Sequence, residues 1–156
     1  MKKIRKVMIL SLFMSIFLLT GCFSKKPIGP DQFKNAMEKK GFVITDATNQ
    51  FASYSFVKKV YVASEKGYKY QIEYFEFASD TNAKAAFNSN KANFESFKDS
   101  ISKENIKIET NDYSKYQNIS NGKYMLTIRA KNIVLFVNAS DKYSSEKKSY
   151  IKGLGY

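Results

Sequence analysis

The chain has 156 residues and a formal net charge of +12, with 26 basic residues against 14 acidic ones. It contains no histidine, which removes the commonest general base and metal ligand of enzymes. A single cysteine excludes a disulfide within these residues, so the fold depends on packing for its stability. The lysines are scattered and accompany no nucleic-acid recognition motif, so we expect no nucleic-acid partner.

The first 22 residues have the layout of a secretory leader. Basic residues come first, and an apolar run over 7–19 leads to the sequence Leu19-Thr20-Gly21-Cys22. This ending resembles the lipobox of bacterial lipoproteins. The alternative is an uncut transmembrane anchor, but about 13 apolar residues fall short of the roughly 20 that span a bilayer as a helix.

The lipobox resemblance implies a location and a processing step. In that family the cysteine receives a diacylglycerol and the chain is cut just before it. Residues 1–21 would then be a signal peptide, and Cys22 would be the lipid attachment site on the extracytoplasmic side of the cell membrane. Cleavage would remove four basic residues and no acidic one, which lowers the net charge from +12 to +8. The remaining 135 residues suffice for one domain.

Residues 22–30 are predicted to form a lipidated tether and residues 31–156 a single domain. Lys25 and Lys26 in the tether would either lie against anionic lipid headgroups or be ordinary solvated charges. Asp31 is predicted to cap a helix that ends at Gly41. The apolar positions of this helix are Phe33, Ala36 and Met37.

A short strand is expected over 42–45 and a loop over 46–54. Residues 56–63 and 68–78 then alternate as a β-hairpin. The alternation breaks at Tyr74-Phe75, which indicates either a bulge or burial of both faces.

Asp80 is predicted to cap the most clearly patterned helix of the chain. Its apolar stripe consists of Ala83, Ala86, Phe87, Phe94 and Phe97. Ile106 and Ile108 indicate a short strand, and a polar loop follows around Asn111 and Asp112.

A second hairpin is expected over 123–129 and 133–138, followed by a helix capped by Asp141. That helix has a stripe made of Tyr143, the stem of Lys147, Tyr150, Ile151 and Leu154. Both hairpins lead through Ala-Ser-Asp into a helix, so the chain contains two β-β-α units, produced either by duplication or by chance. We therefore predict an α+β fold, a twisted antiparallel sheet with two to three helices packed on one face.

No arrangement of residues indicates catalysis, so we predict a protein that is not an enzyme and needs no cofactor or metal. Glu73 and Glu76 are at odd separation on one strand and should point to opposite faces, which argues against a carboxylate pair. The aspartates at element boundaries are better explained as caps than as catalytic groups.

Tyrosine and lysine gather in the later part of the chain and form the candidate ligand-binding site. Its residues are Tyr113, Lys115, Tyr116, Lys123 and Tyr124. An exposed surface of this kind could stack on sugar rings or contact acidic polymers. The alternative is that these rings cover the sheet edge and the core.

A second resemblance covers most of residues 31–156. The segments Asn121-Gly122-Lys123-Tyr124, Val134-Leu135-Phe136-Val137 and Gly153-Leu154-Gly155-Tyr156 are similar to those of small Firmicute lipoproteins without an assigned activity. This resemblance supports the location and the architecture, and it implies no site residues.

The sequence therefore predicts a lipid-anchored binding or interaction module at the cell envelope. Its expected partners are the membrane, through the lipid, and an envelope protein. The alternative is a binder of an anionic wall polymer or glycan through the lysine and tyrosine surface.

Overall fold

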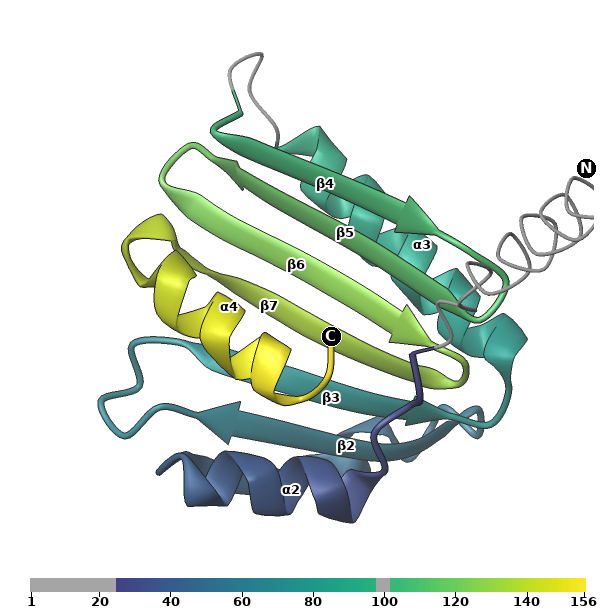
Figure 1. The fold of residues 1–156 in the computed structure, drawn as a ribbon. Helices are drawn as coiled ribbons and strands as arrows, with labels where there is room; N and C mark the ends of the chain where they lie inside the picture. Colours follow the sequence, from purple (N-terminus) through teal and green to yellow (C-terminus); the bar gives the residue numbers. More distant parts are fainter. Residues whose placement is uncertain (1–24, 98–101) are drawn as a thin grey trace, which may run out of the picture.

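The computed structural model describes residues 25–97 and 102–156 (Figure 1). The predicted signal peptide and the lipid attachment site at Cys22 lie outside the described residues. The described strands are β1 (Val43–Asp46), β2 (Val57–Ser64), β3 (Gln71–Phe77), β4 (Glu104–Glu109), β5 (Tyr113–Ser120), β6 (Lys123–Ala130) and β7 (Ile133–Ser140). The described α-helices are α2 (Pro30–Lys39), α3 (Asp80–Ser96) and α4 (Ser144–Gly153). Two short 3-10 turns, η2 (Thr48–Phe51) and η3 (Asp141–Tyr143), complete the elements.

All seven strands form one antiparallel sheet in the order β1-β2-β3-β7-β6-β5-β4. The chain builds two meanders, β1 to β3 and β4 to β7, and the β3–β7 pairing joins them. The α+β class, the antiparallel sheet and both predicted hairpins are confirmed. None of the described helices is both long enough and apolar enough to cross a membrane.

Strand β5 was not predicted, because its sequence is largely polar. It pairs with β6 through a two-residue turn at Asn121-Gly122, where both residues have positive φ, 52° and 69°. Asparagine followed by glycine favours this turn because both tolerate the left-handed backbone region.

The helices cover both faces of the sheet, so the prediction that they pack on one face is wrong. Figure 1 shows α2 and α4 in front of the sheet and α3 behind it. In β6, Leu126 packs in one core with Phe33 of α2 and Ile151 of α4, whereas its neighbour Met125 packs with Phe87 of α3. The physical reason is that the neighbouring strand β7 is apolar on both sides, with Leu135 in the core under α2 and α4 and Val134 and Phe136 on the α3 side, so each side needs a cover.

The two β-β-α units are present in chain order, but their helices leave the sheet on opposite faces. Ser79 caps α3 directly, accepting a 3.2 Å hydrogen bond from the Asn82 amide. The 3-10 turn η3 instead separates β7 from α4. A two-fold axis relating antiparallel β3 and β7 would keep both helices on one face. The arrangement therefore lacks the symmetry that a simple duplication leaves.

The helix caps differ from the predicted aspartates. Gly29 is the N-cap of α2, and Pro30 occupies the first helical position, which suits its fixed φ. Asp31 and Asp80 lie in the first turns of α2 and α3, where a negative charge is favourable to the helix dipole. Asp141 begins η3 rather than capping α4.

The chain is attached to the domain earlier than the predicted boundary at residue 31. The Ile28 amide donates to the Tyr156 hydroxyl at 2.8 Å, and the Tyr74 hydroxyl donates to the Ile28 carbonyl at 3.2 Å. The Ile28 side chain also packs against the core under α2 and α4. The tether predicted over 22–30 is therefore part of the fold from Ile28 onward.

The cover of the rear face by α3 is testable with two variants of the same helix. Phe87 is 1% exposed, whereas Phe97, predicted as part of the same stripe, is 58% exposed at the C-cap. We expect Phe87→Ala to lower the free energy of unfolding by about 3–5 kcal/mol and Phe97→Ala by less than about 1 kcal/mol. Urea unfolding measures both, and equal losses would contradict the described position of α3.

Candidate functional site

The three tyrosines of the predicted binding site are buried. Tyr113 is 3% exposed, and Tyr116 and Tyr124 are fully buried. Tyr113 and Tyr124 belong to the core under α2 and α4, whereas Tyr116 packs against Phe94 on the α3 side. The expectation that these tyrosine rings are exposed and can stack on a ligand is therefore wrong. The alternative, that these rings cover the core, describes their positions.

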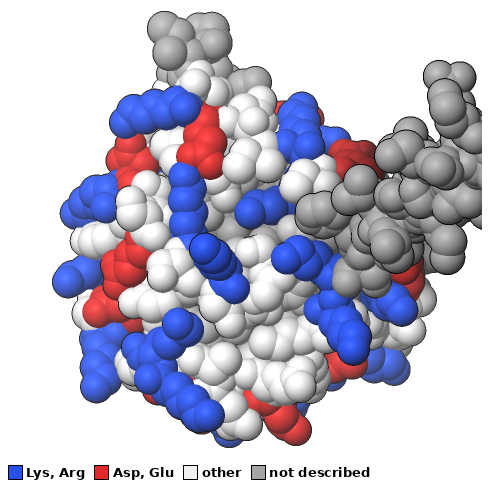
Figure 2. Space-filling view, in the orientation of Figure 1, with Lys and Arg blue, Asp and Glu red and all other residues white. Residues whose placement is uncertain are grey.

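The two lysines of that predicted site are placed apart from each other. Lys123 is exposed, with its Nζ 5.5 Å from the centroid of the Phe97 ring. Lys115 is partly buried among charges of the α2 and α4 side, and burial lowers the pKa of its ammonium group. Figure 2 shows basic side chains spread over this face, with acidic side chains among them. An anionic polymer could therefore contact basic side chains of this surface, but the tyrosine rings would not take part in binding.

Lys147 is more deeply placed than its sequence position indicated. Its ammonium group as well as its stem is buried, surrounded by tyrosine rings. The Nζ atom lies 4.2 Å from the centroid of Tyr70, 4.9 Å from that of Tyr143 and 5.7 Å from that of Tyr124. Burial lowers the pKa of this group to about 8. These rings supply cation–π attraction in place of a carboxylate, so Lys147 is a structural element of the core.

A groove runs along α3 on the rear face of the sheet. Its lining comes from α3, from strands β3 and β7, and from Phe56 just before β2. Two adjoining hollows, about 280 and 470 Å³ in volume, share Phe77, Ala86 and Ser89 in their lining. The sheet side of the groove is aromatic, and the helix side carries small or polar side chains. The remaining lining residues are Phe56, Glu73, Phe75, Thr81, Asn82, Ala85, Asn90, Val134 and Phe136.

The sheet side belongs to a closed ring of five aromatic side chains, here called the aromatic cluster. Its members are Phe51, Tyr54, Phe56, Phe75 and Phe77. Successive ring centroids lie 5.5 to 6.5 Å apart, within the range of favourable aromatic pairs. Phe77 is buried, but Tyr54 is 51% exposed and Phe56 43% exposed. The cluster therefore offers aromatic surface to solvent at the edge of the groove.

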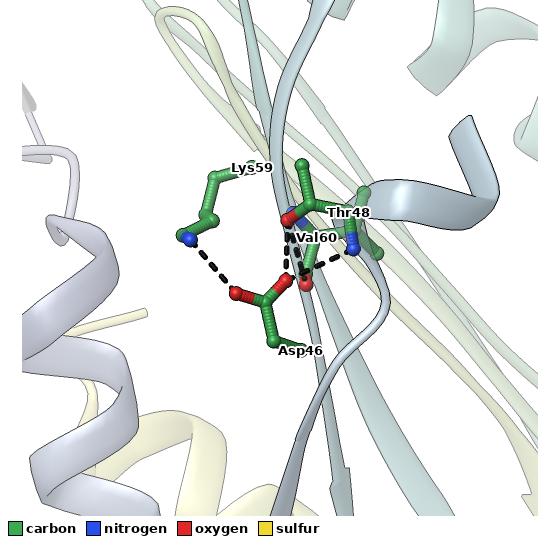
Figure 3. Close-up of polar contacts among 4 residues, drawn as sticks. All are labelled: Asp46, Thr48, Lys59 and Val60. Atoms are coloured by element: carbon green, nitrogen blue, oxygen red, sulfur yellow. Dashed lines mark hydrogen bonds and ion pairs between the residues drawn. The ribbon is translucent and has the colours of Figure 1, made fainter. Parts of the chain in front are cut away.

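Turn η2 supplies Phe51 to the cluster, and a polar network holds this turn in place (Figure 3). Asp46 accepts hydrogen bonds from the Thr48 amide at 3.0 Å, the Thr48 hydroxyl at 2.5 Å and the Lys59 ammonium group at 2.8 Å. The Thr48 hydroxyl in turn accepts from the Val60 amide at 3.1 Å. These contacts fasten η2 to strand β2 and thereby fix the Phe51 ring against Phe75.

Glu73 is the charged side chain of the groove lining. Its carboxylate accepts a 2.9 Å hydrogen bond from the Gln71 amide group. Burial raises the pKa of the Glu73 carboxyl above its ordinary value. The sequence correctly placed Glu73 and Glu76 on opposite faces, since Glu73 lines the α3 groove and Glu76 pairs across the sheet with Lys59 and Ile133.

The groove was not predicted, although one sequence signal pointed toward it. The broken alternation at Tyr74-Phe75 left open a bulge or burial of both faces. The second alternative is confirmed, because Tyr74 packs under α2 and Phe75 joins the cluster on the α3 side. The register shift of this hairpin lies elsewhere, between Val57 and Lys59.

The groove combines apolar surface, amide and hydroxyl groups and one carboxylate, an arrangement suited to holding a ligand. Within residues 25–97 and 102–156, no group of three or more cysteine or acidic side chains could hold a metal ion.

No protein-family description matches the chain, and a search of curated proteins found no match. Among solved structures, the chain is similar to a GTP binding regulator from Thermotoga maritima. The two share 16% identity over 84% of this chain and 89% of that one, with a TM-score of 0.47. A similarity this distant carries no argument about function.

The network under η2 gives a pH-dependent prediction. Hydrogen bonds from Lys59 and Thr48 lower the pKa of the Asp46 carboxyl from 3.8 to about 2. Because this pKa is lower in the folded state, the stabilisation is present above about pH 4 and is lost as the pH falls toward 2. Carboxyl NMR titration should show Asp46 titrating near 2, and titration at its ordinary value would contradict the network.

Two variants separate the parts of this network. We expect Asp46→Ala to shift the Phe51 ring signals and to speed hydrogen exchange at Thr48. The loss of global stability should be at most about 1 kcal/mol, since the ion pair is exposed. Asp46→Asn keeps an acceptor for Thr48 and removes the charge, so its Phe51 shifts should be smaller.

Proposed function

We propose that the protein is a lipid-anchored binding module of the cell envelope whose ligand site is the groove along α3. The lipobox-like ending at Cys22 supports the anchor, and the aromatic cluster supports the site. The observation that carries the binding site is the pairing of aromatic rings, Phe56 among them at 43% exposed, with small side chains across one groove.

The composition of the two sides explains why this region suits a ligand. Contact between aromatic surface and water is unfavourable. An apolar ligand that covers the rings would remove this contact and gain binding free energy. On the opposite side, Ala85, Ala86 and Ser89 leave space that larger side chains would fill. The ligand should therefore have an apolar or aromatic body.

The attachment of the N-terminal segment is consistent with a ligand that arrives from outside the membrane. Ile28 is fastened to Tyr74 and Tyr156 on the face opposite α3. Residues 23–27 separate Ile28 from Cys22, and six peptide steps reach at most roughly 20 Å. A lipid on Cys22 would hold the domain close to the bilayer on the α2 and α4 side, with the groove facing away.

Lipid labelling tests the anchor. In the native bacterium or a related host, we expect a labelled fatty acid to be incorporated into the wild-type chain. Cys22→Ala should abolish the label and release the protein from the membrane fraction. A wild-type chain that keeps its leader and carries no lipid would contradict the proposed anchor.

Filling the groove tests the binding site. Ser89 is exposed and lines both hollows, so Ser89→Phe should obstruct the groove without disturbing the core. We expect it to weaken binding of the neutral apolar dye N-phenyl-1-naphthylamine at least about tenfold, the effect of losing roughly 1.4 kcal/mol of contact.

The control is Ala92→Phe, which adds the same ring to an exposed position of α3 outside the lining. This variant should bind the dye as the wild type does. Equal weakening by both variants, or no binding of the dye by the wild type, would contradict the groove as the site.

A further inference from the structure

We propose that the ligand of the groove is a small organic amine, with its ammonium group on Glu73 and its apolar body along Phe75, Phe77 and Phe56. This inference rests on the proposed function and adds to it the chemical class of the ligand.

The first observation is that Glu73 has no ion-pair partner among residues 25–97 and 102–156. Five ion pairs occur within the described residues, and they use Asp46, Glu95, Glu104, Glu109 and Asp141. Glu73 forms none of them, although basic residues outnumber acidic ones by 26 to 14 in the chain. Withdrawing an ionised carboxylate from water without a cation is unfavourable, and the neutral amide of Gln71 compensates only in part.

The second observation is the aromatic surroundings of this carboxylate. Phe136 lies directly opposite Glu73 in the β3–β7 pairing, and Phe75 follows two residues later on the same face. Directly opposed residues of antiparallel strands have side chains about 5 Å apart. The faces of aromatic rings attract cations, so an ammonium group at Glu73 would gain from the rings as well as from the carboxylate.

The third observation concerns the charge and size of the hollow. The lining contains no lysine or arginine, so nothing in it repels a cation, whereas an anionic ligand would be repelled by Glu73. The hollow that includes Glu73 is about 280 Å³, near the lower limit of small-molecule sites. Asn90 and Ser89 place further polar groups in its lining. These features favour a primary amine on an alkyl or arylalkyl chain.

A matched pair of compounds tests the inference. 4-Phenylbutylamine and 4-phenylbutan-1-ol differ only in the terminal group, and NMR titration of the whole domain measures both affinities. At pH 7.5 we expect both compounds to shift the signals of Ala86 and Ser89, with the amine binding at least about fivefold more tightly.

Two variants locate the source of this preference. Glu73→Gln should remove the preference for the amine and leave the affinity for the alcohol within about twofold. Glu76→Gln neutralises a carboxylate on the opposite face of the same strand and should keep the preference. In the wild type the preference should decline as acid protonates Glu73.

The outcomes distinguish the two proposals. If the compounds bind the groove equally well, or if the preference survives in Glu73→Gln, the amine inference is overturned and the groove remains a binding site. If neither compound shifts the groove residues, the groove itself is overturned.

Discussion

The structure depends on how much of a seven-stranded sheet its helices can cover. With strands about 4.8 Å apart, the sheet is roughly 29 Å wide, whereas a helix with its side chains is about 10 Å across. Two helices, α2 and α4, share the front face, but α3 alone covers the rear and lies mainly over β6 and β7. On the β4 side of α3, ion pairs such as Lys91 with Glu109 and Lys107 with Glu95 suit exposed strand surface. On the other side the aromatic cluster covers the sheet, and the groove lies between this cluster and the helix.

The parts of the fold that the sequence predicted are those specified by local patterns. Alternation and turn residues located both hairpins within three residues of their observed bounds. Strand β5 was missed because Ser114, Gln117 and Asn118 are buried polar residues, which local pattern assigns to a loop. The Asn121-Gly122 turn was the signal that could have identified it. The face taken by each helix was not predictable, because a strand that is apolar on both sides, such as β7, does not indicate which helix covers which side.

The site was harder to predict because it depends on contacts between distant parts of the chain. The aromatic cluster joins Phe51, Tyr54 and Phe56, from one stretch of the chain, with Phe75 and Phe77 from another. The β2–β3 hairpin places Phe56 beside Phe77, and the Ala78 amide donates to the Phe56 carbonyl at 2.8 Å. The polar network around Asp46 places Phe51 over Phe75, and no short-range pattern reveals that contact. The clustered tyrosines of the later strands were conspicuous in sequence, but the register of β5 and β6 turns their rings into the core. Exposure, rather than the number of aromatic residues, distinguishes the two groups.

The most direct measurement is an intermolecular NOE spectrum of the domain with N-phenyl-1-naphthylamine bound. The account predicts contacts from the dye to the Phe77 ring and the Ala86 methyl group, from the two sides of the groove. Contacts to residues of the α2 and α4 side such as Ile151, or a dye that gives no contact to the groove, would contradict it.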